Sequence, residues 1–238
     1  MTLFISHIHS EIRRARTTKR GATHSARDVP RGTHKEYARM QKVALPPPNP
    51  ILAPFGEVIH TRTSYRNCTH GQDAAIPIET LSTLLGSALK KRAEASNRNY
   101  PSGGALYPVE TYLITEALDG FGPTVFHYNP THHELETLWP LSSRLTLKDL
   151  ARKPDDLHFS SLIVFTSVWK RSSAKYGDLA YTHALLEAGH MSENILLTAT
   201  ALNLLTRPMA GFSDEKIIEI LDLDPEEEQP IHTIVLCR

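Results

Sequence analysis

The most informative part of the chain reads Tyr100-Pro101-Ser102-Gly103-Gly104-Ala105-Leu106-Tyr107-Pro108 and then Val109-Glu110-Thr111-Tyr112-Leu113-Ile114-Thr115. Adjacent glycines lack side chains, so the backbone amides around them can approach a flat or anionic ligand closely. The second segment alternates in character, which predicts a half-buried strand. A turn of this composition is more often only a turn, so its meaning depends on the rest of the chain.

Periodicity predicts further helices and strands around this stretch. A first helix is expected over Ile78–Ala88, because its apolar residues fall on one helical face. The continuously apolar run 162–168 predicts a buried central strand. Residues 129–132 supply the turn of a hairpin. Other strands are expected at 109–115, 124–128, 134–138 and 231–237.

A long helix is predicted from about Tyr181 to Leu205. It is apolar nearly all round, so it belongs in a core or in a large subunit interface. Ser213 is placed to cap a last helix, and the acidic residues that follow favour the helix dipole. Helices and strands mix without a regular βα repeat, which predicts an α+β fold rather than a doubly wound α/β fold.

Length, charge and cysteine content limit the classes of protein. The 238 residues suit one folded domain, expected at 51–238, preceded by a basic arm and proline-rich connector at 1–50. The formal net charge is +0, which gives no reason to expect nucleic acid or a membrane as a partner. The start of the chain resembles no secretory signal, and two cysteines are too few for a disulfide scaffold, so a cytoplasmic protein is expected.

Two further segments carry groups suited to chemistry. Arg62-Thr63-Ser64-Tyr65-Arg66 sets a hydroxyl between two guanidiniums, which suits a phosphate. So short a basic segment is in most proteins only part of the surface. Lys175-Tyr176 offers two titratable groups for proton transfer, against the plain alternative of a lysine that points into water.

No metal site is predicted. Glu187 and His190 form a Glu-x-x-His pattern on the long helix, but a di-iron site needs a second copy, which the chain lacks. A packed, hydrogen-bonded His190 is expected instead. His132 and His133 fall in the predicted hairpin turn, so solvent exposure is expected for both.

Taken as a set, these segments resemble a known family. Pro101–Pro108 resembles the central motif of the SagB-type azoline dehydrogenases, a branch of the FMN-dependent nitroreductase superfamily. Residues 62–66 resemble the family's Arg-x-Ser-x-Arg element, and residues 175–190 resemble the segment that leads into its long helix. Ala210-Gly211-Phe212-Ser213-Asp214 resembles its glycine-phenylalanine turn. The resemblance covers roughly residues 24 to 238 and rests on the order of the motifs.

The resemblance implies a nitroreductase-like fold, with a central mixed or antiparallel sheet flanked by helices and a long buried helix at a homodimer interface. It implies FMN as the cofactor. The FMN phosphate would be held by Arg62, Ser64, Arg66 and Arg238. The flavin ring would lie against Pro101, Ser102, Gly103, Gly104 and the backbone of Ala210 and Gly211. Lys175 and Tyr176 match the positions at which the family carries out acid–base chemistry.

The chain departs from the family pattern near its end. Cys237 stands before Arg238, where the family usually has a glycine. The long helix ends in Asn203-Leu204-Leu205 instead of Gly-Leu-Gly, and asparagine tolerates the left-handed conformation nearly as well as glycine. If Arg66 and Arg238 converge on one phosphate, Cys68 and Cys237 become neighbours that could cross-link on oxidation.

The favoured hypothesis is an FMN-dependent oxidoreductase that oxidises a thiazoline or oxazoline ring to a thiazole or oxazole, in a peptide or carrier-bound natural-product intermediate. Lys175 or Tyr176 would take the ring proton while the flavin accepts a hydride. A cyclase or a carrier protein would then be a partner. Two alternatives stay open: an NAD(P)H-dependent nitro or quinone reductase, and a non-catalytic scaffolding subunit of a peptide-modifying complex that docks through the basic arm.

Overall fold

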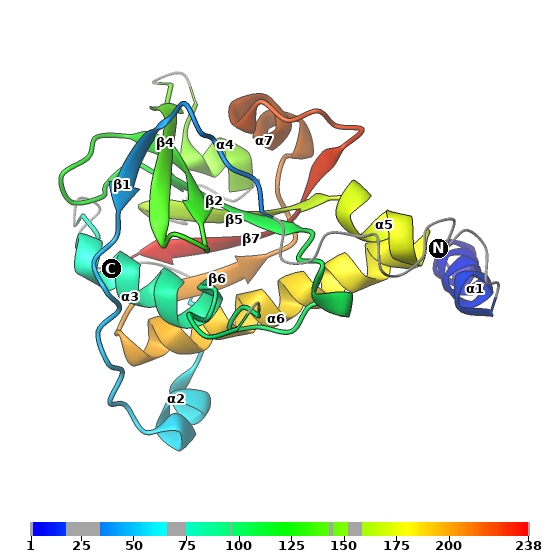
Figure 1. Cartoon of the computed structure of the whole chain (residues 1–238), viewed down its shortest axis with the longest axis horizontal. Helices are drawn as coiled ribbons and strands as arrows, with labels where there is room; N and C mark the ends of the chain where they lie inside the picture. Colours follow the sequence, from blue (N-terminus) through cyan, green and yellow to red (C-terminus); the bar gives the residue numbers. More distant parts are fainter. Residues whose placement is uncertain are drawn as a thin grey trace.

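The computed structural model describes residues 2–17, 34–65, 75–95, 97–142, 145–151 and 159–237. Seven strands in this part of the chain form one sheet, and all neighbouring strands are antiparallel (Figure 1). In spatial order they are β1 (Gln41–Ala44), β4 (Glu134–Pro140), β3 (Thr124–Asn129), β2 (Val109–Thr115), β5 (Ser161–Val168), β7 (Glu228–Cys237) and β6 (Leu205–Met209). The predicted α+β class is confirmed. Of the two kinds of sheet expected, mixed or antiparallel, the sheet is antiparallel.

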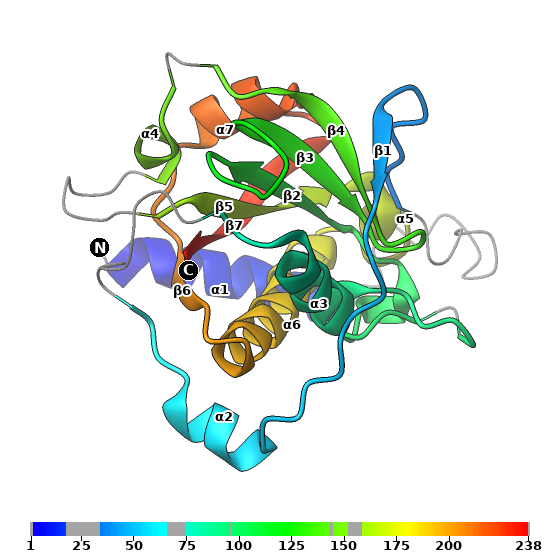
Figure 2. The same ribbon diagram turned by 90° about the vertical axis from the view of Figure 1, so that its left-hand side faces the viewer.

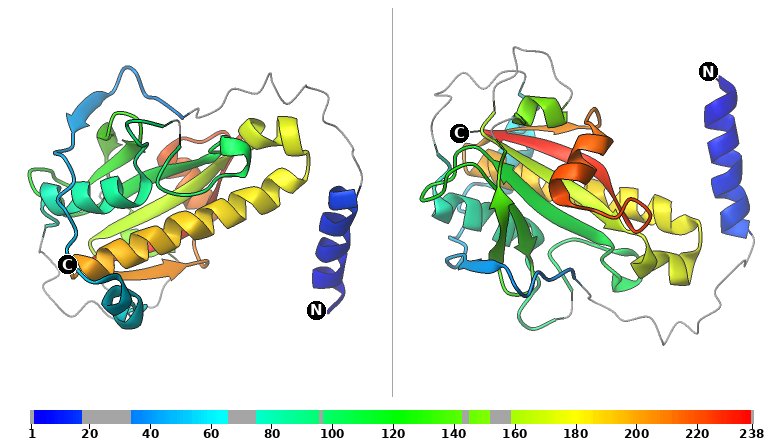
Figure 3. Two further views of the ribbon diagram at one scale, coloured as in Figure 1. Left: turned by 60° about the horizontal axis from the view of Figure 1, so that its bottom comes forward. Right: turned by 90° about the horizontal axis from the view of Figure 1, so that it is seen from above.

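Helices cover both faces of this sheet. They are α1 (Thr2–Thr17), α2 (Phe55–Thr61), α3 (Ile78–Leu89), α4 (Leu147–Ala151), α5 (Lys170–Tyr176), α6 (Leu179–Ala201) and α7 (Asp214–Leu221). α3 and α6 lie on one face, and α4 and α7 lie on the other (Figures 1 and 2). α1 lies outside these layers at the edge of the molecule (Figure 3). Within the described ranges, no helix has the length and apolar character needed to cross a membrane.

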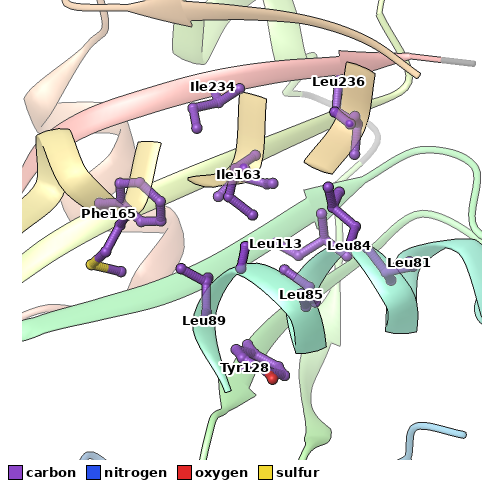
Figure 4. Close-up of a cluster of buried hydrophobic side chains, with 14 of the residues drawn as sticks. Leu81, Leu84, Leu85, Leu89, Leu113, Tyr128, Ile163, Phe165, Ile234 and Leu236 are labelled. Carbon is purple, nitrogen blue, oxygen red and sulfur yellow. The ribbon is translucent and has the colours of Figure 1, made fainter. Parts of the chain in front are cut away.

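Alternation along the strands divides the core into two clusters. Successive side chains of a strand point to opposite faces, so Val109 and Leu113 join the cluster beneath α3 and α6, whereas Tyr112 and Ile114 join the cluster beneath α4 and α7. Figure 4 shows the first cluster, where leucines of α3 meet side chains of β2, β3, β5 and β7. Because both faces are covered, every residue of β2 is buried; the half-buried strand that the sequence predicts is wrong on this point.

Most of the predicted elements are confirmed. The helix predicted at 78–88 is α3, which α1 and α2 precede in the chain. The predicted hairpin joins β3 to β4, and the predicted central apolar strand is β5, which lies between β2 and β7. The long helix is α6, but it ends at Ala201 because Asn203 takes a φ of 57°. The left-handed turn expected at Asn203 is therefore confirmed. Ser213 precedes α7, yet its side chain makes no cap hydrogen bond, so the predicted capping role is wrong.

α6 is buried along one side only. Ala184, Ala188, Met191 and Ile195 are buried against the sheet. On its other side Tyr181, Leu185 and Leu186 are 53%, 41% and 56% exposed. The apolar pattern all round the helix thus corresponds to one buried side and one side that a single chain leaves open.

A strap formed by residues 34–44 ties the start of the domain to the sheet. The N–H of Lys35 donates to Oε1 of Glu110 at 2.6 Å, and Nζ of Lys35 donates to Oε2 of Glu228 at 2.8 Å. Further along, Lys42 pairs with Glu136, and β1 pairs with β4. These contacts join part of the predicted 1–50 segment to the sheet, and the division of the chain at residue 50 stays a prediction.

Candidate active site

A strained turn at residues 102–107 forms the centre of the site. The hydroxyl of Ser102 accepts the N–H of Tyr107 at 2.9 Å and closes the turn. Inside it, Gly104, Ala105 and Tyr107 have φ values of 66°, 55° and 49°. Positive φ suits glycine but costs other residues on the order of 1–2 kcal/mol, and such strain gathers at functional sites. We call this segment the glycine turn.

The last turn of α5 brings Lys175 and Tyr176 against the glycine turn. A Cβ atom on Gly104 would lie 2.7 Å from Nζ of Lys175 and 2.7 Å from Oη of Tyr176. Nζ of Lys175 also lies 5.1 Å from the centre of the Tyr176 ring. Two residues that the sequence assigns to acid–base chemistry and one that it assigns to ring binding therefore meet, and a side chain on Gly104 would crowd both of the others.

His183 of α6 completes this side of the turn. Its Nδ1 atom lies 3.2 Å from the position of a Cβ on Gly103. Its ring packs edge-on against the ring of Tyr176, with 4.4 Å between the ring centres. The sequence places His183 on the long helix without assigning it a role, and no local signal in the sequence links it to the glycine turn.

Arg171 anchors α5 to the glycine turn. Its guanidinium donates to the backbone carbonyl of Tyr107 at 3.0 Å and pairs with the carboxylate of Glu110. Arg171 precedes Lys175 by one helical turn, so this anchor sets where Lys175 lies. Neither Arg171 nor Glu110 stands out in the sequence, because one looks like a surface arginine and the other like the polar member of an alternating strand.

Glu110 continues into a buried chain of charges. Nε2 of His127 lies 3.0 Å from Oε2 of Glu110, and Nδ1 of His127 lies 2.7 Å from Oε2 of Glu136. Burial alone would lower the pKa of His127, but its two carboxylate partners outweigh burial and raise it. Burial alone would raise the pKa of Glu110, but Arg171 and His127 lower it to about 2. This chain is fully paired and holds the sheet, the strap and α5 together.

A cavity of about 440 Å³ opens on the glycine turn. Its lining residues are Arg92, Asn97, Arg98, Asn99, Tyr100, Pro101, Ser102, Ala105 and Tyr107. Pro101 and Ser102, both predicted to line a flavin, thus border an open space of the size that small ligands occupy. The guanidinium of Arg98 is held here by the hydroxyl of Tyr100 at 2.7 Å.

The predicted phosphate residues lie elsewhere. Arg62 follows α2, and its Nε lies 3.9 Å from Oε1 of Glu193 on α6. Ser64 is exposed, and the N–H of Tyr65 donates to the carbonyl of Thr206 in β6 at 3.2 Å. Glu193 follows His183 by ten residues, which is about 15 Å along a helix. A single chain therefore holds Arg62 and the glycine turn well apart.

The remaining residues predicted to bind FMN are not brought to the glycine turn by any contact that the structure describes. Ala210 and Gly211 are exposed directly after β6, and a Cβ on Gly211 would meet nothing within 4 Å. Arg66 and Arg238 lie outside the described residues. Cys237 is disulfide-bonded. Cys68, the other cysteine of the chain, lies outside the described residues, so the cross-link predicted between Cys68 and Cys237 stays a prediction.

Histidines and carboxylates form no metal centre in the described ranges. His190 is exposed, so the packed state expected for it is wrong. His133 is 3% exposed and reaches the hydroxyls of Tyr128 and Ser82 at 2.9 and 2.8 Å. The expected solvent exposure of His133 is therefore wrong, whereas His132 is exposed as predicted.

Residues 59–237 match the nitroreductase family. The chain belongs to the nitroreductase family. The microcin B17-processing protein McbC of Escherichia coli is 30% identical over 165 residues, which are 66% of this chain and 60% of McbC. The trifolitoxin-processing protein TfxB of Rhizobium leguminosarum bv. trifolii is 25% identical over 225 residues, which are 88% of this chain and 60% of TfxB. This chain thus spans 60% of the length of each of these two relatives.

A solved structure shares this nitroreductase fold. A chain of the Escherichia coli microcin synthetase McbBCD complex with truncated pro-MccB17 bound aligns with a TM-score of 0.65 and 24% identity. The match covers 76% of this chain and 71% of that chain. The nitroreductase-like fold and the resemblance inferred from the motifs are both confirmed.

The nitroreductase family generally uses flavin cofactors, and the residues of this chain fit a flat ligand. Side chains on Gly103 and Gly104 would occupy the space in front of His183, Lys175 and Tyr176. Nδ1 of His183 is a buried polar atom without a hydrogen-bond partner. A narrow face without side chains and an unpaired donor or acceptor behind it are what a polar aromatic ring system needs.

Proposed function

We propose that this nitroreductase-family chain is an FMN-dependent oxidase that converts a thiazoline or oxazoline ring to the aromatic azole. The convergence of Lys175 and Tyr176 on Gly104 carries this proposal. A proton acceptor pair lies against a turn that a flat ring can approach, which suits removal of a proton beside a redox cofactor. McbC and TfxB, both named for processing a peptide product, support a peptide as the substrate.

The cofactor would be FMN. Its phosphate suits Arg62 and Ser64, together with Arg66 and Arg238, because guanidinium forks match phosphate oxygens. Its ring suits the face formed by Pro101, Ser102, Gly103 and Gly104, with the backbone at Ala210 and Gly211 on another side. When bound, FMN would accept the hydride lost by the azoline carbon, with dioxygen as the final oxidant.

The protein would handle the proton. Aromatisation removes one proton and one hydride from the dihydro ring, and Lys175 or Tyr176 takes the proton from the ring carbon. Their atoms Nζ and Oη each lie 2.7 Å from the Cβ position of Gly104, so both face the same part of the glycine turn. The anchor from Arg171 to Tyr107 keeps α5 at this distance. A positioned base of this kind contributes about 10²–10⁴-fold to a rate.

A homodimer would complete the site. Exposed apolar side chains lie on α6 and on the neighbouring α2, namely Tyr181, Leu185, Leu186, Phe55 and Ile59. Apolar surface of this kind is typical of an interface. Because one chain keeps Arg62 and the glycine turn well apart, we propose that two copies together hold each flavin. Sedimentation at micromolar concentration would show a dimer, and a monomer that binds FMN fully would contradict this part.

A cyclase or a carrier protein would present the substrate. The fold match lies in a complex that holds a truncated pro-peptide, and an azoline must first be formed by cyclisation of a cysteine, serine or threonine residue. We therefore propose that this chain acts after a cyclase and works on a tethered substrate.

The test combines flavin content with one double variant. The purified protein should carry FMN, visible in its absorption spectrum and released on denaturation. Lys175→Met combined with Tyr176→Phe should keep FMN and lose azoline oxidation, at least a hundredfold. An unchanged oxidation rate would remove the assignment. Rapid bleaching by NAD(P)H without azoline oxidation would favour the reductase alternative, and a colourless protein that takes up no FMN would leave the scaffolding alternative.

A further inference from the structure

Two buried polar atoms near the glycine turn have no hydrogen-bond partner. They are Nδ1 of His183 and Oε2 of Glu187. The two residues are four apart on α6, so their side chains lie next to each other on one face of the helix. Leaving a buried polar atom unpaired destabilises the folded protein. Two such atoms lie next to each other beside the glycine turn, which suggests that they serve the function of the site and not the stability of the fold.

Contacts place both side chains directly behind the glycine turn. Nδ1 of His183 lies 3.2 Å from the Cβ position of Gly103, and its ring packs on Tyr176. Oε1 of Glu187 lies 3.5 Å from the backbone nitrogen of Val109, where the turn becomes β2. The hydroxyl of Ser102 lies beside the same carboxyl. Tyr176 thus contacts His183, and Glu187 lies one helical turn beyond His183 on the same face of α6.

Glu187 differs from Glu110, the other buried glutamate close to the turn. Glu110 is paired with Arg171 and His127, which keeps its carboxylate charged. Glu187 is 2% exposed, and its Oε2 atom has no hydrogen-bond partner. The groups with which it interacts are Ser102, Arg98, Glu110, Tyr100 and the N–H of Val109, with His183 one turn before it on α6. Glu110 is therefore a structural acid, and Glu187 is free to change its charge.

The surroundings of both groups suit proton storage at neutral pH. Burial raises the pKa of Glu187 to about 7, and Ser102 and Arg98 offset only part of that effect. Burial lowers the pKa of His183, so its imidazole is neutral and has one nitrogen to accept and one to donate a proton. A neutral imidazole can accept a proton at one nitrogen and release one from the other.

We propose that His183 and Glu187 form a proton-holding pair behind the glycine turn, which takes over the proton that Lys175 or Tyr176 removes from the substrate. The inference rests on the proposed function. The proton leaves the base, passes through the imidazole of His183 and converts the Glu187 carboxylate to the acid, while the hydride follows its separate route. Release of this proton to water restores the carboxylate for the next turnover.

The first test is the pH dependence of one variant. Glu187→Gln keeps the shape of the side chain and its contact with Val109, but it cannot titrate. Flavin bleaching by a peptide with one thiazoline, in single turnover without air, should rise through a midpoint near pH 7 in the parent protein. The variant should lose this midpoint and be about tenfold slower above it. Glu219→Gln, exposed on α7, is the matched control and should keep the parent profile.

The second test needs no substrate. Between about pH 6 and pH 8, where ordinary carboxyl groups stay ionised, the infrared carbonyl band of a protonated carboxylic acid should disappear from the parent protein as the pH rises through about 7, and it should be missing from Glu187→Gln throughout this range. His183→Phe keeps the packing on Tyr176 and should retain the band yet show the slower bleaching. If the parent protein does not oxidise the thiazoline, the proposed function fails, and the band still decides whether Glu187 holds a proton. A band that does not titrate near neutral pH, or a Gln variant with the parent profile, would overturn the pair.

Discussion

Arg171 donates to the backbone carbonyl of Tyr107 at 3.0 Å and thereby joins α5 to the glycine turn. The same guanidinium pairs with Glu110, which belongs to the buried chain of charges beneath the strap. The position of α5, which carries the proposed acid–base residues, and the stability of the fold therefore depend on one side chain. Lys175 and Tyr176 reach Gly104 only because this anchor holds the helix that carries them.

Replacing Arg171 should damage both properties. Arg171→Met leaves Glu110 buried without its arginine, which should lower the free energy of unfolding by about 3 kcal/mol. Oxidation per folded molecule should fall further, because α5 loses its contact with Tyr107. Urea unfolding and turnover on the same samples measure the two effects. Lys170→Ala, on an exposed position of the same helix, is the control and should change neither; full turnover in the Met variant would contradict the anchor.

Comparing Gly104→Ala with Gly120→Ala separates the effect of backbone strain from the effect of contact with Lys175 and Tyr176. Gly104 has a φ of 66° and would place a Cβ 2.7 Å from both Nζ of Lys175 and Oη of Tyr176. Gly120 has a φ of 81° and nothing within 4 Å of a Cβ. Both alanine variants should lose about 1 kcal/mol of stability from the backbone. Only Gly104→Ala should lose oxidation, and equal activity of the two variants would show that the contact has no role.

Gly211→Ala tests the second face of the proposed flavin site. A Cβ at Gly211 meets no atom within 4 Å in the single chain, so thermal stability of the apoprotein should be unchanged. FMN affinity should fall about tenfold if the ring lies against this backbone, because the methyl group would hold the ring away. Gly56→Ala, equally open, serves as the control. Titration of apoprotein with FMN gives both affinities, and identical values would remove Gly211 from the site.

His133 should make the protein sensitive to acid. Burial lowers the pKa of His133 to about 4, with a smaller effect of Lys90 in the same direction. The unfolded chain binds a proton near pH 6.5, so stability contributed by neutral His133 is lost as the pH falls from about 6.5 to about 4. The loss should approach 3 kcal/mol. Urea unfolding of His133→Gln should lack this part of the pH dependence, while His132→Gln, exposed next door, should keep it.

Local pattern was sufficient for the regular elements and for the chemistry of single segments. The glycine turn, the strand after it and Lys175-Tyr176 were all predicted, because turn composition and apolar periodicity are properties of neighbouring residues. Their meeting at Gly104 joins positions about seventy residues apart in the sequence, which periodicity does not contain. The order of the motifs, which resembles that of a known family, was the basis for predicting that these residues share a site.

Several buried residues were not predicted because their partners come from distant parts of the chain. Glu110 looks like the solvent-facing member of an alternating strand, but the N–H of Lys35 reaches it from 75 residues away. His133 looks like a turn histidine, but Pro46 and Ser82 close over it. Glu187 stands out in the sequence only as half of a Glu-x-x-His pattern, and its place beside the glycine turn follows only from the tertiary fold. In each case the partner comes from an element whose position only the tertiary fold decides.

The most direct test of the central claim mixes the FMN-loaded protein with a thiazoline peptide in the absence of air. The flavin absorption should bleach, and one thiazole should form for each flavin reduced, whereas the Lys175→Met, Tyr176→Phe variant should stay coloured and leave the peptide unchanged. Bleaching by NAD(P)H together with recovery of the intact thiazoline would contradict azoline oxidation as the function of this chain.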